Sequence, residues 1–141
     1  MTTTEVPYSP DELRDQWAAL VREIPAWLVA NDPDNPSRRR CAVREVRRIT
    51  QEGYVADDLD DDVDWIMNND LGRRLPIVMH HDMAHRRELV ELAAEIGAVS
   101  TGLSESDTQF IELLGAGLGI RPDTVEALVM NAVRSAGLRA A

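Results

Sequence analysis

The chain has 141 residues, an apolar share of 44% and a net charge of −10, and all 15 of its basic residues are arginines. These values are typical of one globular domain, and the negative charge opposes nonspecific attraction to nucleic acid or to an anionic membrane. The single cysteine, Cys41, excludes an internal disulfide and a cysteine-based zinc site.

No apolar run approaches the roughly 18 residues that a membrane span needs. The first residues show neither the basic nor the apolar region of a secretory signal, so we expect a cytoplasmic protein. We predict a flexible tail at residues 1–8 and a single all-α domain, a compact bundle of about six helices, over residues 9–141.

The first helix is predicted to begin after Ser9. Ser9 can cap it, Pro10 suits the first helical position and Glu12 can complete a capping box. An apolar stripe follows at helical spacing and consists of Leu13, Trp17, Leu20, Val21, Ile24, Trp27 and Leu28. Pro25 lies inside this stripe, and we expect it to kink or split the helix near Ile24.

A turn cluster at residues 31–36 precedes a second helix, predicted from Pro36 to about Glu52, with Gly53 ending it. Its outer face carries six arginines: Arg38, Arg39, Arg40, Arg44, Arg47 and Arg48. This face could bind phosphates, an acidic partner or the acidic run at residues 57–64. We favour pairing within the chain or with a protein, because no aromatic residues interleave with the arginines to stack bases.

The third helix is predicted to open at Asp57, with Leu59, Val63, Ile66 and Met67 facing inward. The dense carboxylates of residues 57–64 could bind calcium or magnesium. They lack the Gly and the terminal Glu of an EF-hand loop, so we favour a solvated acidic face or one paired with the arginines.

The fourth helix is predicted from about Pro76 to Gly97, and all three histidines lie near its start. His81 and His85 are spaced i, i+4, which lets two imidazoles bind one divalent metal from one helix face. His80 and Asp82 are the neighbouring candidate ligands, although Asp82 should point about 100° away from His81. The alternatives are that the histidines extend the apolar stripe or form a pH-responsive contact.

Ser104 is predicted to cap a fifth helix, with Asp107 completing an imperfect capping box. Its apolar face would consist of Phe110, Leu113, Leu114 and Leu118. A sixth helix would run from Pro122 to Gly137, with Val125, Leu128, Val129 and Val133 inward. Residues 111–128 also match a helix-turn-helix, but the outward Asp123 and Glu126 would repel phosphates, so we expect no nucleic-acid partner.

Residues 83–133 resemble the TerB-like family, named for tellurite resistance. The matching segments are residues 86–92, the loop 101–107 and the turn 118–122. The resemblance implies a bundle of two related halves, each a helix–loop–helix–turn–helix, whose acidic loop residues can bind divalent metal. In this chain Thr101 replaces the expected Asp and Asp107 is shorter than the expected Glu.

A faint internal repeat accompanies this resemblance, and neither a Gly-rich phosphate loop nor a nucleophile elbow is present. We therefore expect a non-enzymatic interaction or sensing module, in a stress response or a larger assembly, with a protein partner or self-association. The first alternative is a metal-binding protein using His81 and His85, and the second is a helix-turn-helix regulator.

Overall fold

Helices alone build the described part of the chain, which in this computed structural model covers residues 7–99 and 102–140, with side chains up to Ala136. The elements in order are α1 (Pro10–Asn31), α2 (Pro36–Thr50), α3 (Ala56–Asn68), the 3-10 helix η1 (Leu71–Arg74), α4 (Leu75–Val78), α5 (Met83–Ala98), α6 (Glu105–Gly117) and α7 (Pro122–Ala140). No strand occurs in these two ranges, so the predicted all-α bundle is confirmed.

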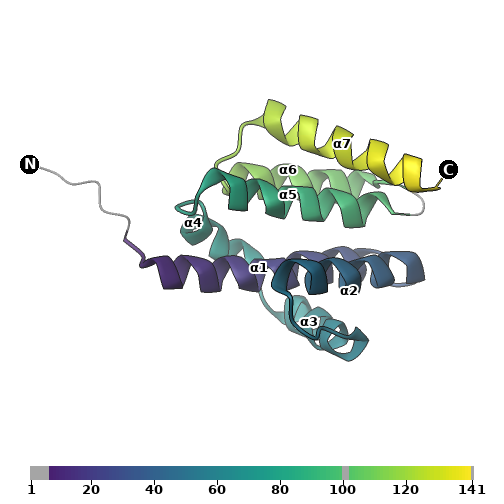
Figure 1. The fold of residues 1–141 in the computed structure, drawn as a ribbon, viewed down its shortest axis with the longest axis horizontal. Helices are drawn as coiled ribbons and strands as arrows, with labels where there is room; N and C mark the ends of the chain where they lie inside the picture. The colour runs from purple at the N-terminus through teal and green to yellow at the C-terminus, as the bar shows by residue number, and fades with distance from the viewer. Residues whose placement is uncertain (1–6, 100–101, 141) are drawn as a thin grey trace, which may run out of the picture.

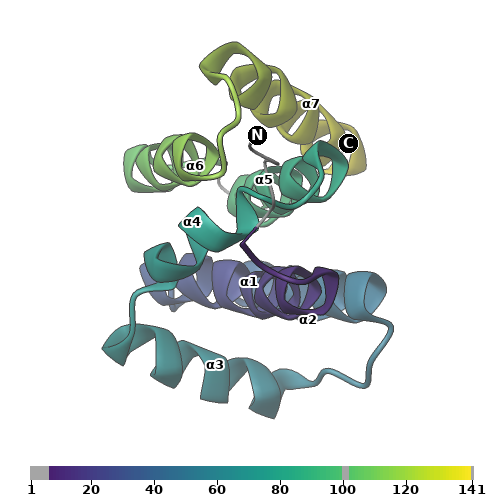
Figure 2. The ribbon, with the colours of Figure 1, turned by 90° about the vertical axis from the view of Figure 1, so that its left-hand side faces the viewer.

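The helices form two groups, which Figures 1 and 2 show from two sides. The first group contains α1, α2 and α3, and the second contains α5, α6 and α7, with η1 and α4 connecting them. α1 contacts α2, α3 and α5, whereas α5 contacts α6 and α7 as well as α1. The two groups therefore meet mainly through α1 and α5.

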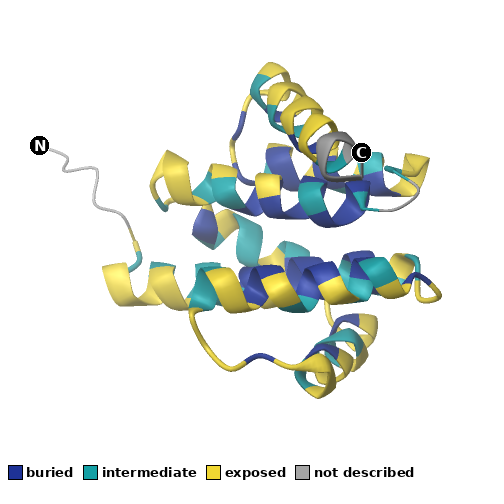
Figure 3. Cartoon of the chain, turned by 45° about the vertical axis from the view of Figure 1, so that its right-hand side comes forward, coloured by how far each residue is buried: buried dark blue, intermediate teal, exposed yellow. Residues whose placement is uncertain are grey.

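The hydrophobic core includes the facing sides of α1 and α5. Leu20, Ile24 and Leu28 of α1 are fully buried, and so are Leu89 and Ile96 of α5. Figure 3 shows buried residues on the inner sides of the helices and exposed residues on the outer sides. Burying one such side chain contributes about 1.5–3 kcal/mol, so this contact is a main source of stability.

α1 begins as predicted, because the Glu12 N–H donates to Ser9 Oγ at 3.1 Å and Pro10 occupies the first helical turn. The predicted split at Pro25 is wrong, since α1 is continuous from Pro10 to Asn31. A proline inside a helix costs about 3 kcal/mol. Pro25 is itself buried between Ile24 and Ala26, and packing on both sides of it offsets this cost.

Two helix ends differ from the prediction. α2 ends at Thr50, because Gln51 adopts the left-handed conformation (φ 57°) and its N–H donates to the Arg47 carbonyl. α7 continues to Ala140, past Gly137. A glycine inside a helix costs about 1 kcal/mol relative to alanine, which is not enough to end a helix that has other support.

The helix predicted over residues 76–97 is interrupted. α4 ends at Val78, residues 79–82 form a turn, and α5 begins at Met83. Asp82 is the N-cap of α5, because its Oδ1 accepts a hydrogen bond from the His85 N–H at 2.8 Å. An Asp side chain competes for backbone donors in this way, which favours a new helix start over continuation.

Three residues predicted to face inward are exposed: Met67 and Leu113 at 71%, and Val133 at 45%. In each case an immediate neighbour is buried instead, namely Ile66, Leu114 and Ala132. Successive residues of a helix point about 100° apart, so where the buried face of the helix is narrow, only one of two neighbouring side chains packs into the core.

Residues 1–6, most of the predicted tail, lie outside the described residues, and so does Thr101 of the family loop. Tyr8, at the end of the predicted tail, is half-buried, with its ring 5.7 Å from that of His80. Among the helices of the described ranges, none has the length and apolarity needed to cross a bilayer.

Candidate functional site

A groove between α2 and α3 gathers most of the arginines predicted to form an interaction face. This basic groove has a volume of about 700 Å³. Its charged lining consists of Arg39, Arg40, Arg44, Arg47 and Arg48. Its apolar lining consists of Pro36, Val43, Ala56 and Leu59. The helical spacing of α2 places residues three and four positions apart on one face, which is why these side chains gather along one wall.

Ion pairs compensate part of the groove's charge. Arg39 pairs with Asp60 of α3. Arg48 pairs with the buried Glu45 at 3.2 Å, and Arg44 lies 3.8 Å from the same carboxylate. Two carboxylates thus compensate part of the charge of three of the five arginines.

Arg40 and Arg47 make no ion pair with any residue in the ranges that the structure describes. Arg40 donates to the Ser37 hydroxyl at 3.3 Å, and its side chain is exposed to solvent, as is that of Arg47. The groove therefore combines an apolar lining with arginine charge that remains available to an anionic ligand.

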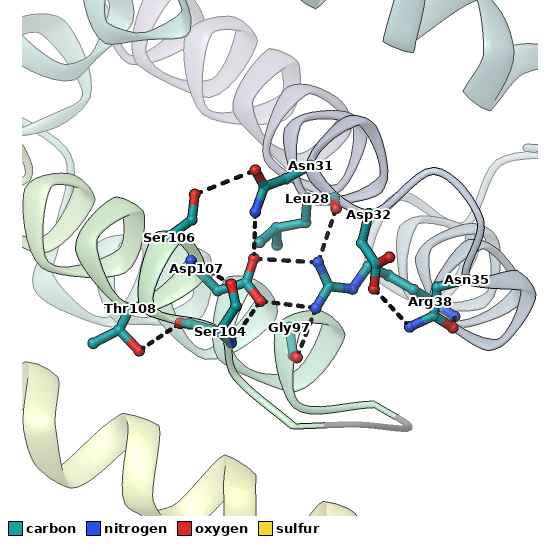
Figure 4. A network of polar contacts seen from close by, with 10 residues as sticks. All are labelled: Leu28, Asn31, Asp32, Asn35, Arg38, Gly97, Ser104, Ser106, Asp107 and Thr108. Carbon is teal, nitrogen blue, oxygen red and sulfur yellow. Dashed lines mark hydrogen bonds and ion pairs between the residues drawn. The ribbon is translucent and has the colours of Figure 1, made fainter.

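Arg38, predicted to belong to this face, is instead 1% exposed and lies in the interior, as Figure 4 shows. Its Nη1 donates to the Leu28 carbonyl and its Nη2 to the Gly97 carbonyl, both at 2.9 Å. The same two nitrogens donate to the carboxylate of Asp107 in α6, at 3.2 and 2.9 Å. Burying a guanidinium requires acceptors in place of water, and these three residues supply them for Nη1 and Nη2. The buried Nε has no hydrogen-bond partner within the described ranges.

Asp107 is the acceptor at the centre of this buried network. Its carboxylate accepts from the Ser104 N–H at 3.1 Å while Ser104 Oγ accepts from the Asp107 N–H at 3.0 Å, so the predicted capping box is formed. Asn31 Nδ2 also donates to Asp107, at 3.0 Å. Burial raises the pKa of Asp107, but hydrogen bonds from Arg38, Ser104 and Asn31 outweigh it and hold the pKa below its ordinary value.

The start of α5 forms a second candidate site. His81, Asp82 and His85 offer ligand atoms that all lie within 4.8 Å of one another, and we name this set the histidine cluster. Asp82 Oδ2 lies 2.7 Å from His85 Nδ1 and 3.5 Å from His81 Nδ1. The ring centroids of His81 and His85 are 4.3 Å apart.

The histidine cluster forms for a different reason from the predicted one. His81 lies in the turn before α5, so the two histidines do not share one continuous helix face. Asp82, expected to point about 100° away from His81, contacts both rings from the N-cap position. The fourth candidate, His80, lies outside the cluster with its ring against Tyr8.

Trp17 of α1 forms one wall of the histidine cluster. Its Nε1 donates to the His85 carbonyl at 2.9 Å, and its ring centroid lies 5.1 Å from the His85 ring and 6.3 Å from the His81 ring. Burial lowers the pKa of His81, and the positive charge of a protonated His85 lowers it further. Hydrogen bonds from the backbone and then the ring of His85 lower the pKa of Asp82. These effects favour a neutral His81 imidazole beside an ionised carboxylate.

The predicted helix-turn-helix corresponds to α6, residues 118–121 and α7. Gly119 adopts a φ of 71° in the turn, a conformation that glycine reaches without strain. The first turns of α7 expose Asp123 and Glu126, and the preceding Arg121 is paired with Asp123 at 3.3 Å. This surface offers little to a phosphate backbone.

No protein-family model matches the chain, and comparison with curated proteins and with solved structures finds no match either. The functional proposals therefore rest on the chemistry of the basic groove and of the histidine cluster.

Proposed function

We propose that this chain is a non-enzymatic interaction module of TerB-like type that binds an acidic amphipathic helix of a partner protein in the basic groove. One observation carries this proposal: a groove of about 700 Å³ joins five arginines to an apolar lining. Such a module would act as a subunit of a larger assembly or within a stress response.

An amphipathic helix binds a groove by laying its apolar side chains on the floor and its charged side chains on the rim. Val43 and Ala56 offer an apolar surface to such a helix. Arg40 and Arg47 offer planar forks that pair with carboxylates. An exposed pair contributes only about 0.2–1 kcal/mol, so the apolar contact supplies most of the affinity. The arginines select an acidic partner and speed its association.

A protein suits this groove better than a nucleic acid does. None of the nine residues that line it is aromatic, so bases would find no stacking surface. The chain's net charge of −10 would repel the many phosphates of a nucleic acid more than a single short acidic helix.

The TerB-like assignment draws on the resemblance over residues 83–133, which implies two related halves, and the chain has three helices in each of two groups. Asp107 stands near the position of the family's acidic loop ligand. Its two carboxylate oxygens both accept hydrogen bonds from Arg38. A carboxylate engaged in this way is not available to a divalent metal, so we place the function of this chain in its groove and not in that loop.

The test measures binding of a fluorescein-labelled helical peptide, with Leu at i, i+3, i+4 and i+7 and Glu elsewhere, to the full chain by anisotropy. We expect affinity to fall between about 50 and 300 mM salt, because screening weakens exposed charge pairs. Arg40→Glu/Arg47→Glu should weaken binding at least about tenfold, a loss of about 1.4 kcal/mol.

The matched control is Arg73→Glu/Arg87→Glu, which makes the same charge change at two exposed arginines outside the groove. It should leave peptide affinity within about twofold of the unmodified chain. Equal losses in the two double variants, or no binding of the Glu peptide at all, would contradict the proposal. Concentration-dependent dimerisation that Arg40→Glu/Arg47→Glu abolishes would identify a second copy, instead of another protein, as the occupant.

A further inference from the structure

The histidine cluster has a geometry that the basic groove does not explain. Two imidazoles and one carboxylate come from three positions within five residues and converge at the surface. Two of them, His81 and Asp82, precede the helical hydrogen-bonding pattern of α5, and His85 lies in its first turn. The sharp turn between α4 and α5 is what brings these groups together.

We propose that His81, Asp82 and His85 bind one transition-metal dication of the Zn²⁺, Co²⁺ and Ni²⁺ class. Imidazole and a single carboxylate suit these ions, whereas Ca²⁺ and Mg²⁺ require more oxygen ligands than the cluster offers. This site is independent of the proposed function of the basic groove.

The separations of Asp82 from the two imidazoles lie near those of a tetrahedral ion, and the ligand atoms of the whole cluster lie within 4.8 Å of one another. Metal–ligand bonds of about 2.0–2.2 Å place the ligand atoms of a tetrahedral site about 3.3–3.5 Å apart. Asp82 Oδ2 already lies 3.5 Å from His81 Nδ1 and 2.7 Å from His85 Nδ1. An ion would lie between Asp82 Oδ2 and His85 Nδ1, and a shift of under about 1 Å opens that pair to the tetrahedral separation.

Surrounding hydrogen bonds hold the backbone on both sides of the cluster. Trp17 Nε1 donates to the His85 carbonyl at 2.9 Å, and Arg86 Nε donates to the His81 carbonyl at 2.8 Å. These hydrogen bonds fix the backbone positions from which the two imidazoles extend. The ring of Trp17 also lies beside the two imidazoles and meets the His85 ring edge-on.

Three features lower the affinity expected for the ion. The N-terminus of α5 and the guanidinium of Arg86 are positive, although Asp82 compensates one charge. His81 Nδ1 accepts a hydrogen bond from the Asp82 N–H at 2.9 Å, which metal binding through Nδ1 would replace. Three protein ligands also leave a fourth tetrahedral position for water. We therefore expect a micromolar site and not the tighter binding of a closed structural zinc site.

The test is calorimetry of the tag-free full chain with Zn²⁺, together with the visible absorption of tetrahedral Co²⁺. We expect one ion per chain with a Kd below about 10 μM, and no binding of Mg²⁺ under the same conditions. His85→Gln should weaken binding by at least about tenfold, because it removes one of three ligands.

Asp82→Asn separates the two roles of this residue. Asparagine caps a helix as well as aspartate does, so α5 should be retained by circular dichroism while affinity falls by at least about tenfold. His80→Ala is the matched control: it removes a neighbouring exposed histidine outside the cluster and should change affinity by less than about twofold.

Two results would overturn the proposal. The first is no stoichiometric Zn²⁺ or Co²⁺ binding by the folded unmodified chain at about 100 μM metal. The second is an equal loss in His80→Ala and His85→Gln, which would indicate scattered surface binding. Both results leave the peptide-binding test of the basic groove unaffected.

Discussion

Asp107→Ala should strongly destabilise this fold. It removes the carboxylate that pairs with Arg38, and it removes the acceptor for Ser104 and Asn31. Arg38 is 1% exposed, so water cannot replace the lost partner. The guanidinium would keep only the carbonyls of Leu28 and Gly97.

The expected cost is about 3–5 kcal/mol, the range measured when one partner of a buried ion pair is removed. Of this, about 1 kcal/mol comes from the lost capping-box interaction at the start of α6. Since domains are stable by about 5–15 kcal/mol in total, Asp107→Ala should fold only marginally. Asp107→Asn should cost less, because its amide oxygen can still accept hydrogen bonds while the negative charge is lost.

Guanidinium unfolding at pH 7, followed by tryptophan fluorescence and circular dichroism, measures these differences. A double-mutant cycle of Arg38→Met and Asp107→Ala isolates the pair, and we expect the double variant to cost less than the sum of these two single variants by about 1–3 kcal/mol. Asp61→Ala, at an exposed carboxylate of α3, is the control and should stay within about 0.5 kcal/mol. The reasoning is refuted if Asp107→Ala costs no more than this control, or if the cycle is additive.

Three further predictions concern acid stability and packing. The folded pKa of Asp107 is depressed, so its contribution to the free energy of unfolding is complete above its ordinary pKa and is lost as pH falls through the folded value. The urea midpoint should therefore fall more steeply between about pH 6 and pH 3 for the unmodified chain than for Asp107→Asn. A Cβ at Gly115 would clash with the side chain that faces it from α7, so Gly115→Ala should cost about 1–3 kcal/mol of stability. A Cβ at Gly53 meets open space, so Gly53→Ala should be tolerated. Calorimetry of the two variants compares their thermal midpoints and checks this difference. Ile66→Ala should cost about 2–4 kcal/mol and Met67→Ala under about 0.5, with the reverse order contradicting the assigned inward face.

The features that follow from neighbouring residues could be predicted from the sequence. Ser9 and Ser104 cap α1 and α6 as expected, and Pro36 and Pro122 lie at the starts of α2 and α7, because caps and first-turn prolines act within four residues. The all-α class follows from the same local patterns.

The role of Arg38 could not be predicted in this way. It stands among exposed arginines with the same chemistry, and its partner Asp107 is 69 residues away. Only the packing of α2 against the ends of α1, α5 and α6 decides that this one arginine is buried. One sequence signal does point to the network: Asp107 occupies a cap position, where a carboxylate is held at a fixed place and can accept a further donor.

The histidines show an intermediate case. Their nearness in sequence predicts their nearness in space, and the pairing of His81 with His85 is present. Asp82 is among the predicted ligands, but the continuous helix predicted over residues 76–97 does not include its role as the N-cap of α5. An Asp that can cap the residue three positions later is a competing helix start, and giving it that weight would have placed the break correctly.

The position of Arg38 also limits where this chain can be divided. A cut in the turn at residues 79–82 would leave Arg38 in one fragment and Asp107 in the other, each with a charge that only the missing fragment neutralises. If the two helical groups arose by duplication of an ancestral gene, neither group could now fold stably without the other. Fusion proteins and circular permutants built on this fold should therefore keep both helical groups in one chain. In a split reporter, each group should fold only when it associates with the other.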